Sequence, residues 1–397
     1  MLVESQIARL DGPFALESGA VLPGIEIAYE TYGTLAPDRS NALLLCHSYT
    51  SDHHAAGRHG PEDERPGWWD ALIGPGKTLD TDRYHVVSSN CLGGAAGSTG
   101  PGTVDPATGR PYGMSFPVVT MADMANAQAR LADHLGIERF RAVIGGCYGG
   151  FQALQWMVTH PERLEAAVVV SATPRASVHT VALSHVMRAA ICSDPKWNGG
   201  DYYGREKPTS GIALFSMFGS LFWQDRNLLQ QRLGPEMREP RTFRFDFAPE
   251  FEIEKLLARL ATPQHTALDP NSLLYLARAN DYFDLSRGRA SLADAFARFR
   301  GRTLLIGFGQ DWRYPPEEIA EIAIALETAG APVTHVTLDD PLGHGAFLRA
   351  PQCLEPTLVP FLASLEPTAE GLTERSDRET SSPPPPDPSR DLGRSGC

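Results

Sequence analysis

The sequence predicts an α/β protein, and three observations support that prediction. Short apolar runs rich in Val, Ile and Leu recur along the chain, and amphipathic stretches of helical length separate them. The composition, with 42% hydrophobic and 21% charged residues, is that of an ordinary globular protein. Apolar runs of this length are typical of strands buried on both faces, and their alternation with helices indicates a mainly parallel sheet covered by helices.

The expected elements follow one another along the whole chain without an internal repeat. The expected strands are Ala42–Cys46, Tyr84–Val87, Arg141–Ile144, Ala166–Val170, Thr303–Phe308 and Val333–Leu338. The clearest helices between them are Met121–Leu135 and Pro316–Ala329. Because strands and helices alternate, we expect crossover connections and parallel neighbours.

The alternation stops between about residues 175 and 300. Helical segments follow one another there without a convincing strand: Thr180–Ile191, Gly211–Gln224, Phe251–Leu260 and Asn271–Ala279. We therefore expect a core made of residues 1–174 and 301–365, with a helical lid inserted at 175–300. Residues 366–397 are rich in Pro and Ser and nearly devoid of apolar side chains, which predicts a disordered tail.

Charge and cysteine usage exclude several classes of protein. The net charge of −13 disfavours nucleic acid as a partner, because phosphate backbones bind basic patches. An apolar run of about 18 residues is absent, and residues 1–10 lack the features of a secretory signal, so we expect no membrane partner and a cytoplasmic location. The cysteines show no CxxC spacing and are expected to be reduced: Cys46, Cys91, Cys147, Cys192, Cys353 and Cys397.

A glycine-rich turn around Cys147 is the strongest chemical signal. Residues 143–152, VIGGCYGGFQ, join an expected strand to an expected helix and fit the nucleophile-elbow pattern G-x-S-x-G, with Cys147 in the serine position. Such a turn strains its central residue and places it at the positive end of a helix, which favours a thiolate. The alternative is an inert buried cysteine beside a tight turn.

Two further residues follow in the order that this elbow requires. In sheets of the α/β-hydrolase type, the acid and then the histidine lie on loops after later strands. Asp311 follows the strand ending at Phe308, and His344 follows the strand ending at Leu338. We predict that His344 is the base for Cys147 and that Asp311 orients the imidazole.

An acyl-transfer site also needs donors for an oxyanion. The backbone amide after the nucleophile, that of Tyr148, is the first candidate, and the amide of Tyr49, in the loop after the strand Ala42–Cys46, is the second.

The chain resembles the homoserine O-acetyltransferase family, with a Cys nucleophile as a divergent feature. The likeness spans roughly residues 14–361 and rests on these motifs: Cys46–Thr50, Pro66–Asp70, Ile73–Lys77, Ser89–Gly93, Gly97–Pro101, the elbow, Trp197–Gly200, Asp311–Trp312 and Gly343–His344. The resemblance implies an α/β-hydrolase fold with a helical lid that often pairs two subunits, and hence a homodimer. It also implies transfer of an acyl group from acyl-CoA to an amino-acid hydroxyl.

Three positions depart from the family pattern. Cys147 replaces the usual serine, Gly345 replaces an Asp that reads the acceptor's amino group, and no Arg lies near Met217, where the family grips the acceptor's carboxylate. The losses put homoserine in doubt as the acceptor, since a missing partner costs on the order of 2 to 5 kcal/mol. Arg175 and Arg313 are the candidate substitutes.

We therefore expect a ping-pong acyltransferase that uses acyl-CoA as a co-substrate and holds no permanent cofactor. The alternatives are a carboxylesterase of the same family and a non-catalytic binding protein on this fold. The residues Gly76-Lys77-Thr78 lack the rest of a P-loop. We expect no metal, because His47, His53, His54 and His59 lack HExxH spacing and acidic partners.

Overall fold

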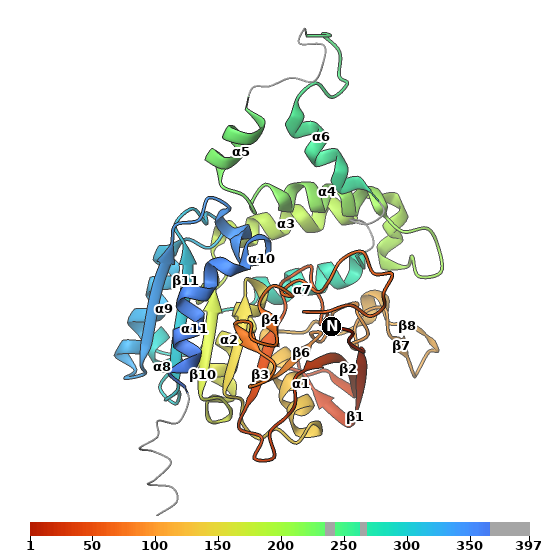
Figure 1. The fold of residues 1–397 in the computed structure, drawn as a ribbon. Helices are drawn as coiled ribbons and strands as arrows, with labels where there is room; N and C mark the ends of the chain where they lie inside the picture. Colours follow the sequence, from red (N-terminus) through yellow and green to blue (C-terminus); the bar gives the residue numbers. More distant parts are fainter. Residues whose placement is uncertain (235–242, 263–267, 366–397) are drawn as a thin grey trace, which may run out of the picture.

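The computed structural model describes residues 1–234, 243–262 and 268–365 (Figure 1). Its central feature is an eight-stranded sheet in the order β1-β2-β6-β3-β9-β10-β11-β12. The strands are β1 (Gln6–Ala15), β2 (Val21–Tyr32), β3 (Ala42–Cys46), β6 (His85–Ser89), β9 (Ala142–Gly146), β10 (Ala166–Val170), β11 (Arg302–Phe308) and β12 (Val333–Leu338). The strands from β6 to β12 run parallel, which confirms the predicted mostly parallel sheet.

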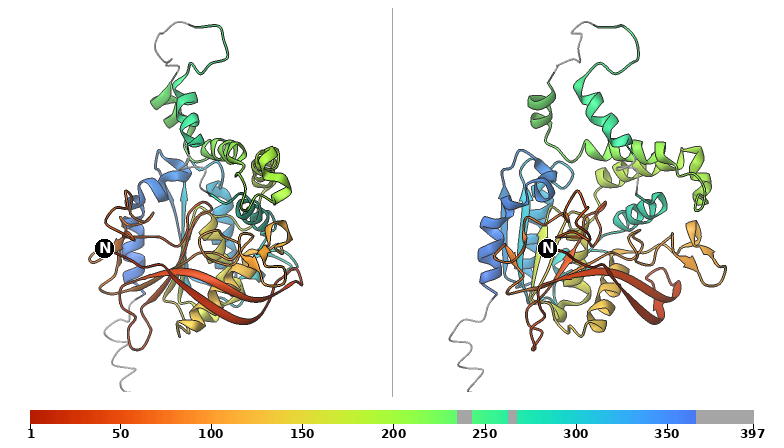
Figure 2. Two further views of the ribbon diagram at one scale, coloured as in Figure 1. Left: turned by 90° about the vertical axis from the view of Figure 1, so that its right-hand side faces the viewer. Right: turned by 45° about the vertical axis from the view of Figure 1, so that its right-hand side comes forward.

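Helices cover this sheet because its central strands are apolar on both faces. Every residue of β3, β6, β9 and β10 is buried. The covering helices include α1 (Met121–His134), α2 (Tyr148–Thr159), α9 (Pro316–Thr328) and α11 (Glu355–Ala363). Helix α2 packs against β9 and β10, and α9 packs against β11 and β12, while α11 lies on the opposite side of the sheet (Figure 2).

The sequence pattern did not reveal the first two strands. β1 and β2 form an antiparallel pair, and β2 continues antiparallel to β6. A register shift between Asp11 and Phe14 interrupts the pair at Gly12 and Pro13, where the apolar pattern also breaks. Both strands alternate buried with exposed residues over much of their length, so they lack the continuous apolar runs by which the buried strands are recognised.

A helical insertion separates β10 from β11. It contains α3 (Val178–Cys192), α4 (Thr209–Ser220), α5 (Arg226–Leu233), α6 (Glu252–Ala258) and α7 (Pro270–Asp281). α3 packs against α4 and α7, whereas α5 and α6 project away from the sheet (Figures 1 and 2). The predicted tail, residues 366–397, lies outside the described residues.

Short elements complete the described chain. They are β4 (Ile73–Gly74), β5 (Leu79–Asp80), β7 (Val104–Asp105), β8 (Arg110–Pro111), α8 (Leu292–Ala295) and α10 (Ala346–Arg349). Within the described ranges, none of the helices is both long and apolar enough to cross a membrane.

Candidate active site

Cys147 sits on a strained turn between β9 and α2. Its backbone has φ 55° and ψ −118°, a left-handed conformation that non-glycine residues rarely adopt. The Cys147 amide donates to the Val170 carbonyl oxygen at 2.8 Å, which ties the turn to the neighbouring strand β10. The side chain is 1% exposed, so the sulfur lies at the base of α2 within the protein.

The glycines around Cys147 are required by close backbone approaches. A Cβ atom on Gly149 would lie 2.0 Å from the carbonyl oxygen of Cys46, and one on Gly145 would lie 2.1 Å from the carbonyl oxygen of Gly149. Both distances are far below contact distance, so any side chain would force the strand and the helix apart. The glycine pattern therefore allows α2 to start directly above the sheet.

Asp311 and His344 meet at the carboxyl ends of β11 and β12. The Asp311 Oδ2 atom lies 2.7 Å from the His344 Nδ1 atom, and both side chains are buried. The second carboxylate oxygen, Oδ1, accepts the amides of Arg313 and Tyr314, each at 3.0 Å. Because both oxygens of Asp311 are bound, the carboxylate is fixed in place and holds the imidazole with Nδ1 as the donor.

The remaining ring nitrogen of His344 faces the Cys147 thiol. The His344 Nε2 atom is buried and has no aligned hydrogen-bond partner among the described residues. Burial alone would lower the pKa of His344, but the charges of Asp311 and Cys147 raise it to about 9. Burial would likewise raise the pKa of Cys147, but the nearby His344 ring, with a smaller effect from Arg313, lowers it. The opposite shifts favour a thiolate and an imidazolium near neutral pH.

The pKa values of the other buried cysteines shift in the opposite direction to that of Cys147. Burial raises the pKa of both the Cys46 and the Cys91 thiol to about 12. Cys192 is exposed on α3, far along the chain from the turn. Cys147 is thus the buried cysteine whose surroundings favour the reactive thiolate.

Both residues of the predicted oxyanion hole line the pocket that holds Cys147. A contact with the Tyr148 amide contributes to the lowered pKa of the Cys147 thiol, so this amide points towards the sulfur. The Tyr49 amide makes no hydrogen bond within the described part of the chain. The Tyr49 ring packs edge-on against Tyr148, with ring centroids 5.5 Å apart, and its hydroxyl donates to the Leu273 carbonyl at 2.5 Å.

A small, largely enclosed pocket surrounds the sulfur. Its lining residues are Tyr49, Cys147, Tyr148, Ser184, Met187, Ala277, Asn280, Arg313 and Tyr314. Arg313 is 7% exposed, and its Nε atom has no hydrogen-bond partner among the described residues. The Oδ1 atom of Asn280 is also buried and unpartnered among them. The pocket thus holds one cationic and one carbonyl group. Its volume is about 10 Å³, which is room for about one water molecule, so a larger ligand requires the lining residues to move apart.

The two candidate arginines are separated by the fold. Arg313 lies in the pocket with Cys147, whereas Arg175 forms an ion pair with Glu321 at 2.6 Å and is not among the pocket residues. The sequence did not point to Asn280, which lies in an amphipathic helix, α7, without any motif. Asn280 lies beside the Cys147 turn only because α7 packs over that turn, and the local sequence does not reveal this packing.

The surroundings of Gly345 leave no room for an acidic side chain after His344. Its amide donates to the Trp223 carbonyl oxygen at 2.9 Å, and a Cβ atom on Gly345 would lie 2.8 Å from the same oxygen. A side chain at position 345 would therefore collide with the insertion. The ring of Trp223 also packs edge-on against His344, with centroids 5.6 Å apart.

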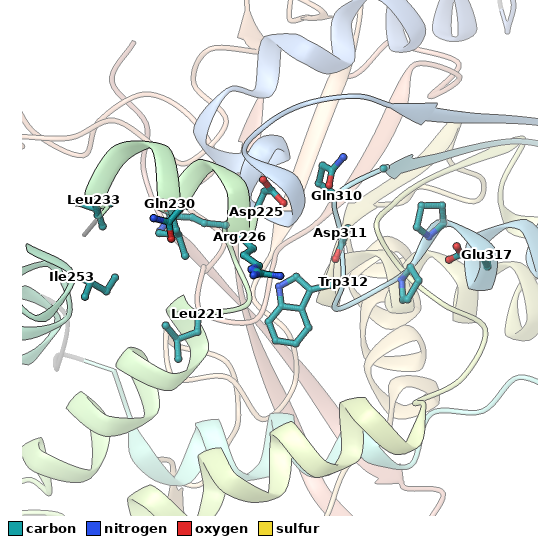
Figure 3. A pocket seen from close by; sticks show the side chains of 16 residues that line it. Leu221, Asp225, Arg226, Gln230, Leu233, Ile253, Gln310, Asp311, Trp312 and Glu317 are labelled. Atoms are coloured by element: carbon teal, nitrogen blue, oxygen red, sulfur yellow. The ribbon is translucent and has the colours of Figure 1, made fainter. Parts of the chain in front are cut away.

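Two larger pockets flank this site. One, of about 830 Å³, lies between α5 and the loop after β11 and reaches Asp311 and Trp312 from the outside (Figure 3). Another, of about 640 Å³, is lined by Tyr49, by the glycine-rich stretch that includes Gly94 and Gly97, and by Lys207. Because Tyr49 lines both this pocket and the small one, the second pocket adjoins the Cys147 site.

The fold and the residue order define the class of protein first. Residues 41–349 match the family model of the alpha/beta hydrolase fold. Cys147, Asp311 and His344 occupy the elbow and the two loop positions at which that fold carries its catalytic groups.

Known relatives narrow the class. A homoserine O-acetyltransferase of Methanosphaerula palustris is 48% identical over 85% of this chain and 68% of its own length. A homoserine O-succinyltransferase of Acidithiobacillus ferrooxidans is 43% identical over 87% of this chain and 91% of its own length. The chain belongs to the homoserine O-acyltransferase family and is an acyltransferase.

Solved structures agree with this assignment. The homoserine O-acetyltransferase of Bacillus anthracis has a TM-score of 0.84 at 31% identity, covering 91% of this chain and 98% of that one. The esterase E22 has a TM-score of 0.82 at 30% identity, covering 91% of this chain and all of that one. The same architecture therefore occurs in proteins described as transferases and as esterases.

Proposed function

We propose that this protein transfers an acyl group from acyl-CoA to the hydroxyl of homoserine, through an acyl-enzyme on Cys147. The observation that carries the proposal is the arrangement of Cys147, His344 and Asp311: a strained turn presents the sulfur to an imidazole that a fully bound carboxylate holds. The family membership supplies the reaction class, and the arrangement supplies the residues.

In the first half-reaction, the Cys147 thiolate attacks the carbonyl carbon of the acyl-CoA thioester. The amides of Tyr49 and Tyr148 stabilise the negative charge that develops on the carbonyl oxygen. When the tetrahedral intermediate collapses, the bond to the CoA sulfur breaks, and His344 donates its proton to the leaving thiolate. The product, a thioester on Cys147, is similar in energy to the donor, so the acyl group remains activated for transfer.

In the second half-reaction, the acceptor hydroxyl takes the place of CoA. His344, now neutral, removes the hydroxyl proton, the oxygen attacks the acyl-Cys147 carbonyl, and the Cys147 thiolate leaves. The O-acyl product departs, and the thiolate and imidazolium are restored. Asp311 keeps the imidazole in one tautomer throughout and does not itself exchange a proton.

Recognition of the acceptor is assigned to groups that replace the missing family residues. Arg313 binds the acceptor's carboxylate, and the Asn280 Oδ1 atom accepts from its ammonium group. Support comes from their burial in the Cys147 pocket and from their unpartnered atoms. Among the described residues, the charged neighbour of this guanidinium is the Cys147 thiolate, and Tyr314 also interacts with it. An acceptor carboxylate would add the paired oxygens that suit a guanidinium. In this proposal, Arg313 and Asn280 replace the lid Arg and the Asp after the catalytic His, the two family residues whose absence put homoserine in doubt as the acceptor.

The adjoining pocket near Tyr49 is proposed to receive the CoA portion of the donor. Its glycine-rich lining and Lys207 suit a phosphorylated chain, and its contact with Tyr49 leads to the sulfur. We further propose that residues 175–300 act as a lid and that two copies of the chain pair through α5 and α6. The arm formed there exposes Phe243, Phe245 and Phe247.

The test is product analysis with donors and acceptors varied independently. Acetyl-CoA and succinyl-CoA are each mixed with homoserine, with serine, or with no acceptor, and the products are identified by mass. The proposal predicts O-acylhomoserine from the wild-type protein and none from Cys147→Ala. Equal release of free acid with and without an acceptor would contradict it.

That contrary result defines the alternative, a carboxylesterase of the same architecture. The similarity to esterase E22 supports it. The two activities differ in what attacks acyl-Cys147, since water needs neither Arg313 nor Asn280. Turnover of nitrophenyl acetate that is unaffected by added alcohols would favour the esterase.

A further inference from the structure

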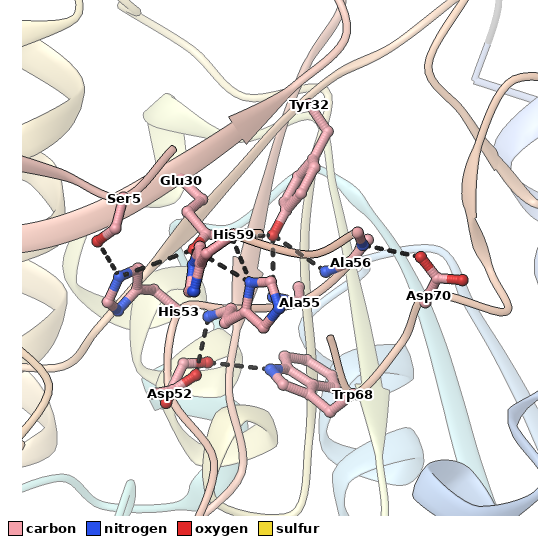
Figure 4. A network of polar contacts seen from close by, with 12 residues as sticks. Ser5, Glu30, Tyr32, Asp52, His53, Ala55, Ala56, His59, Trp68 and Asp70 are labelled. Carbon is pink, nitrogen blue, oxygen red and sulfur yellow. Dashed lines mark hydrogen bonds and ion pairs between the residues drawn. The ribbon is translucent and has the colours of Figure 1, made fainter. Parts of the chain in front are cut away.

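A second cluster of titratable side chains lies on the loop that follows β3. The Glu30 carboxylate, on β2, contacts two imidazoles of that loop (Figure 4). Its Oε1 atom lies 2.6 Å from the His59 Nε2 atom, and its Oε2 atom lies 3.1 Å from the His54 Nδ1 atom. One ligand atom from each of these three residues lies within 4.8 Å of the other two.

The carboxylate at the centre of this cluster is built into the fold. Glu30 is 0% exposed, and each ion pair that the structure gives it is with a histidine. The Tyr32 hydroxyl donates to Glu30 Oε2 at 2.5 Å and accepts the amides of Ala55 and Ala56. The same tyrosine therefore fixes both the carboxylate and the loop that carries the histidines.

We propose that Glu30, His54 and His59 form a binding site for a divalent transition metal of the Zn²⁺ class. Two imidazole nitrogens and one carboxylate oxygen are a ligand set that Zn²⁺ takes in proteins, at bond lengths of about 2.0 to 2.2 Å. The three ligand atoms lie within 4.8 Å of one another, close enough for one ion to contact all of them. His59 is half-exposed, which leaves a path from solvent and a fourth position for water.

Metal binding also resolves the electrostatics of the two rings. The centroids of His54 and His59 lie 4.0 Å apart. Two imidazolium ions at that spacing would repel each other, whereas a bound metal keeps both rings neutral and balances the buried carboxylate. His53 is next to the cluster, with its Nε2 atom 4.0 Å from Glu30 Oε1, but this atom is held by the Ser5 hydroxyl at 2.6 Å.

The site would position the oxyanion loop. Residues 47–59 contain Tyr49, and the Asp52 carboxylate accepts the His54 amide at 2.8 Å, which links the metal ligand to the segment that carries Tyr49. The N-terminal residues close over the other end, because the Val3 amide donates to the Arg58 carbonyl and the Arg58 amide to the Met1 carbonyl. The sequence prediction of no metal rested on the lack of HExxH spacing and of acidic partners. Glu30 supplies an acidic partner from a strand that the pattern did not reveal.

The test is zinc titration of untagged protein by calorimetry after removal of metals with a chelator. The titration uses the Cys147→Ala variant as its background, so that the active-site thiol does not compete for zinc. The proposal predicts one saturable Zn²⁺ per chain. His59→Ala should weaken the affinity at least ~10-fold, because even indirect partners of a metal contribute that much. The control is His335→Ala, which removes an exposed imidazole from β12.

A second readout protects the test against unfolding of the variants. Glu30→Gln keeps the shape of the side chain and should also lose zinc, while circular dichroism shows whether each variant is folded. Bound Co²⁺ should give visible absorption without a thiolate charge-transfer band. Absence of saturable binding, or binding that folded His59→Ala retains in full, would overturn the site and leave a network held by protons. Because the background lacks the sulfur, neither result bears on acyl transfer.

Discussion

At the residue scale, the proposed chemistry depends on two opposed pKa shifts in one buried pair. The pKa of Cys147 is lowered despite its burial, and the pKa of His344 is raised to about 9. At a pH above the lowered pKa of Cys147 and below that of His344, the pair exists as thiolate and imidazolium. A serine at position 147 would not ionise in this range and would depend on His344 to remove its proton during attack.

The pair predicts a distinctive pH dependence of alkylation. Iodoacetamide should modify Cys147 below pH ~8.5, the ordinary thiol value, since its lowered pKa keeps the thiolate present there. In His344→Gln, burial remains and the counter-charge is gone, so the pKa should rise and the rate at neutral pH should fall at least ~10-fold. The rate is followed by mass spectrometry in a Cys192→Ala background, because Cys192 is exposed. An unchanged profile in His344→Gln would show that the ring does not control the thiol.

Arg313 provides a second prediction at this scale. Arg313→Met should raise KM for homoserine and lower kcat/KM roughly 30-fold or more, which corresponds to a loss of about 2 kcal/mol of transition-state stabilisation. The KM for acetyl-CoA should change little. The matched control is Arg175→Met, which removes a half-exposed ion pair with Glu321 and should cost little. If both variants behave alike, Arg313 does not bind the acceptor.

Individual residues also show which parts of the candidate site could be predicted from the sequence. Cys147, Asp311 and His344 were predicted from motifs because the turn and the strand ends carry local patterns. Arg313 and Arg175 could not be separated, since which of them is buried beside the sulfur depends on how the loop after β11 packs. No motif marks Asn280, because its place in the Cys147 pocket arises from the packing of α7 over the turn.

At the element scale, the glycines at the start of α2 decide whether the sulfur is presented at all. Gly149→Ala should destabilise the fold by about 2 kcal/mol or more, because its Cβ would meet the Cys46 carbonyl oxygen at 2.0 Å. Gly60→Ala is the control, since a Cβ there meets nothing within 4 Å. Chemical denaturation measures both. Equal free energies of unfolding would mean that α2 is not held against β3 as described.

The strands differ in how clearly the sequence predicts them. Continuous apolar runs identify the buried strands β3, β9, β10 and β11. β12 was expected to be buried on both faces, but it lies at the edge of the sheet with polar residues between its apolar ones and is only partly buried. β1 and β2 alternate in burial and contain Gly12, Pro13, Pro23 and Gly24, so no run survives. Missing β2 meant missing Glu30, and this is why the histidines of the following loop appeared to lack an acidic partner.

At the scale of the whole molecule, the insertion between β10 and β11 does two things. It closes the Cys147 pocket with residues of α3 and α7, and it extends an arm beyond the sheet. The side chains of Phe245 and Phe247 are almost fully exposed on that arm, which is unusual for large aromatic residues.

From the exposed aromatic side chains of the arm, we predict that the chain self-associates. Light scattering after size-exclusion chromatography should give a dimer for the wild-type chain and a shift towards monomer for the double variant Phe245→Ser, Phe247→Ser. Replacing the exposed Val104 and Met114, which lie outside the insertion, with Ser should leave the dimer intact. A monomeric wild-type protein would contradict pairing through the arm.

The most direct measurement of the central claim is the intact mass of the protein, quenched within seconds of mixing with acetyl-CoA and no acceptor. The mechanism predicts one added acetyl group on the wild-type protein and on Cys192→Ala, none on Cys147→Ala, and loss of the group as O-acetylhomoserine forms when homoserine is added. An unmodified wild-type protein, or equal labelling of Cys147→Ala, would contradict the acyl-enzyme.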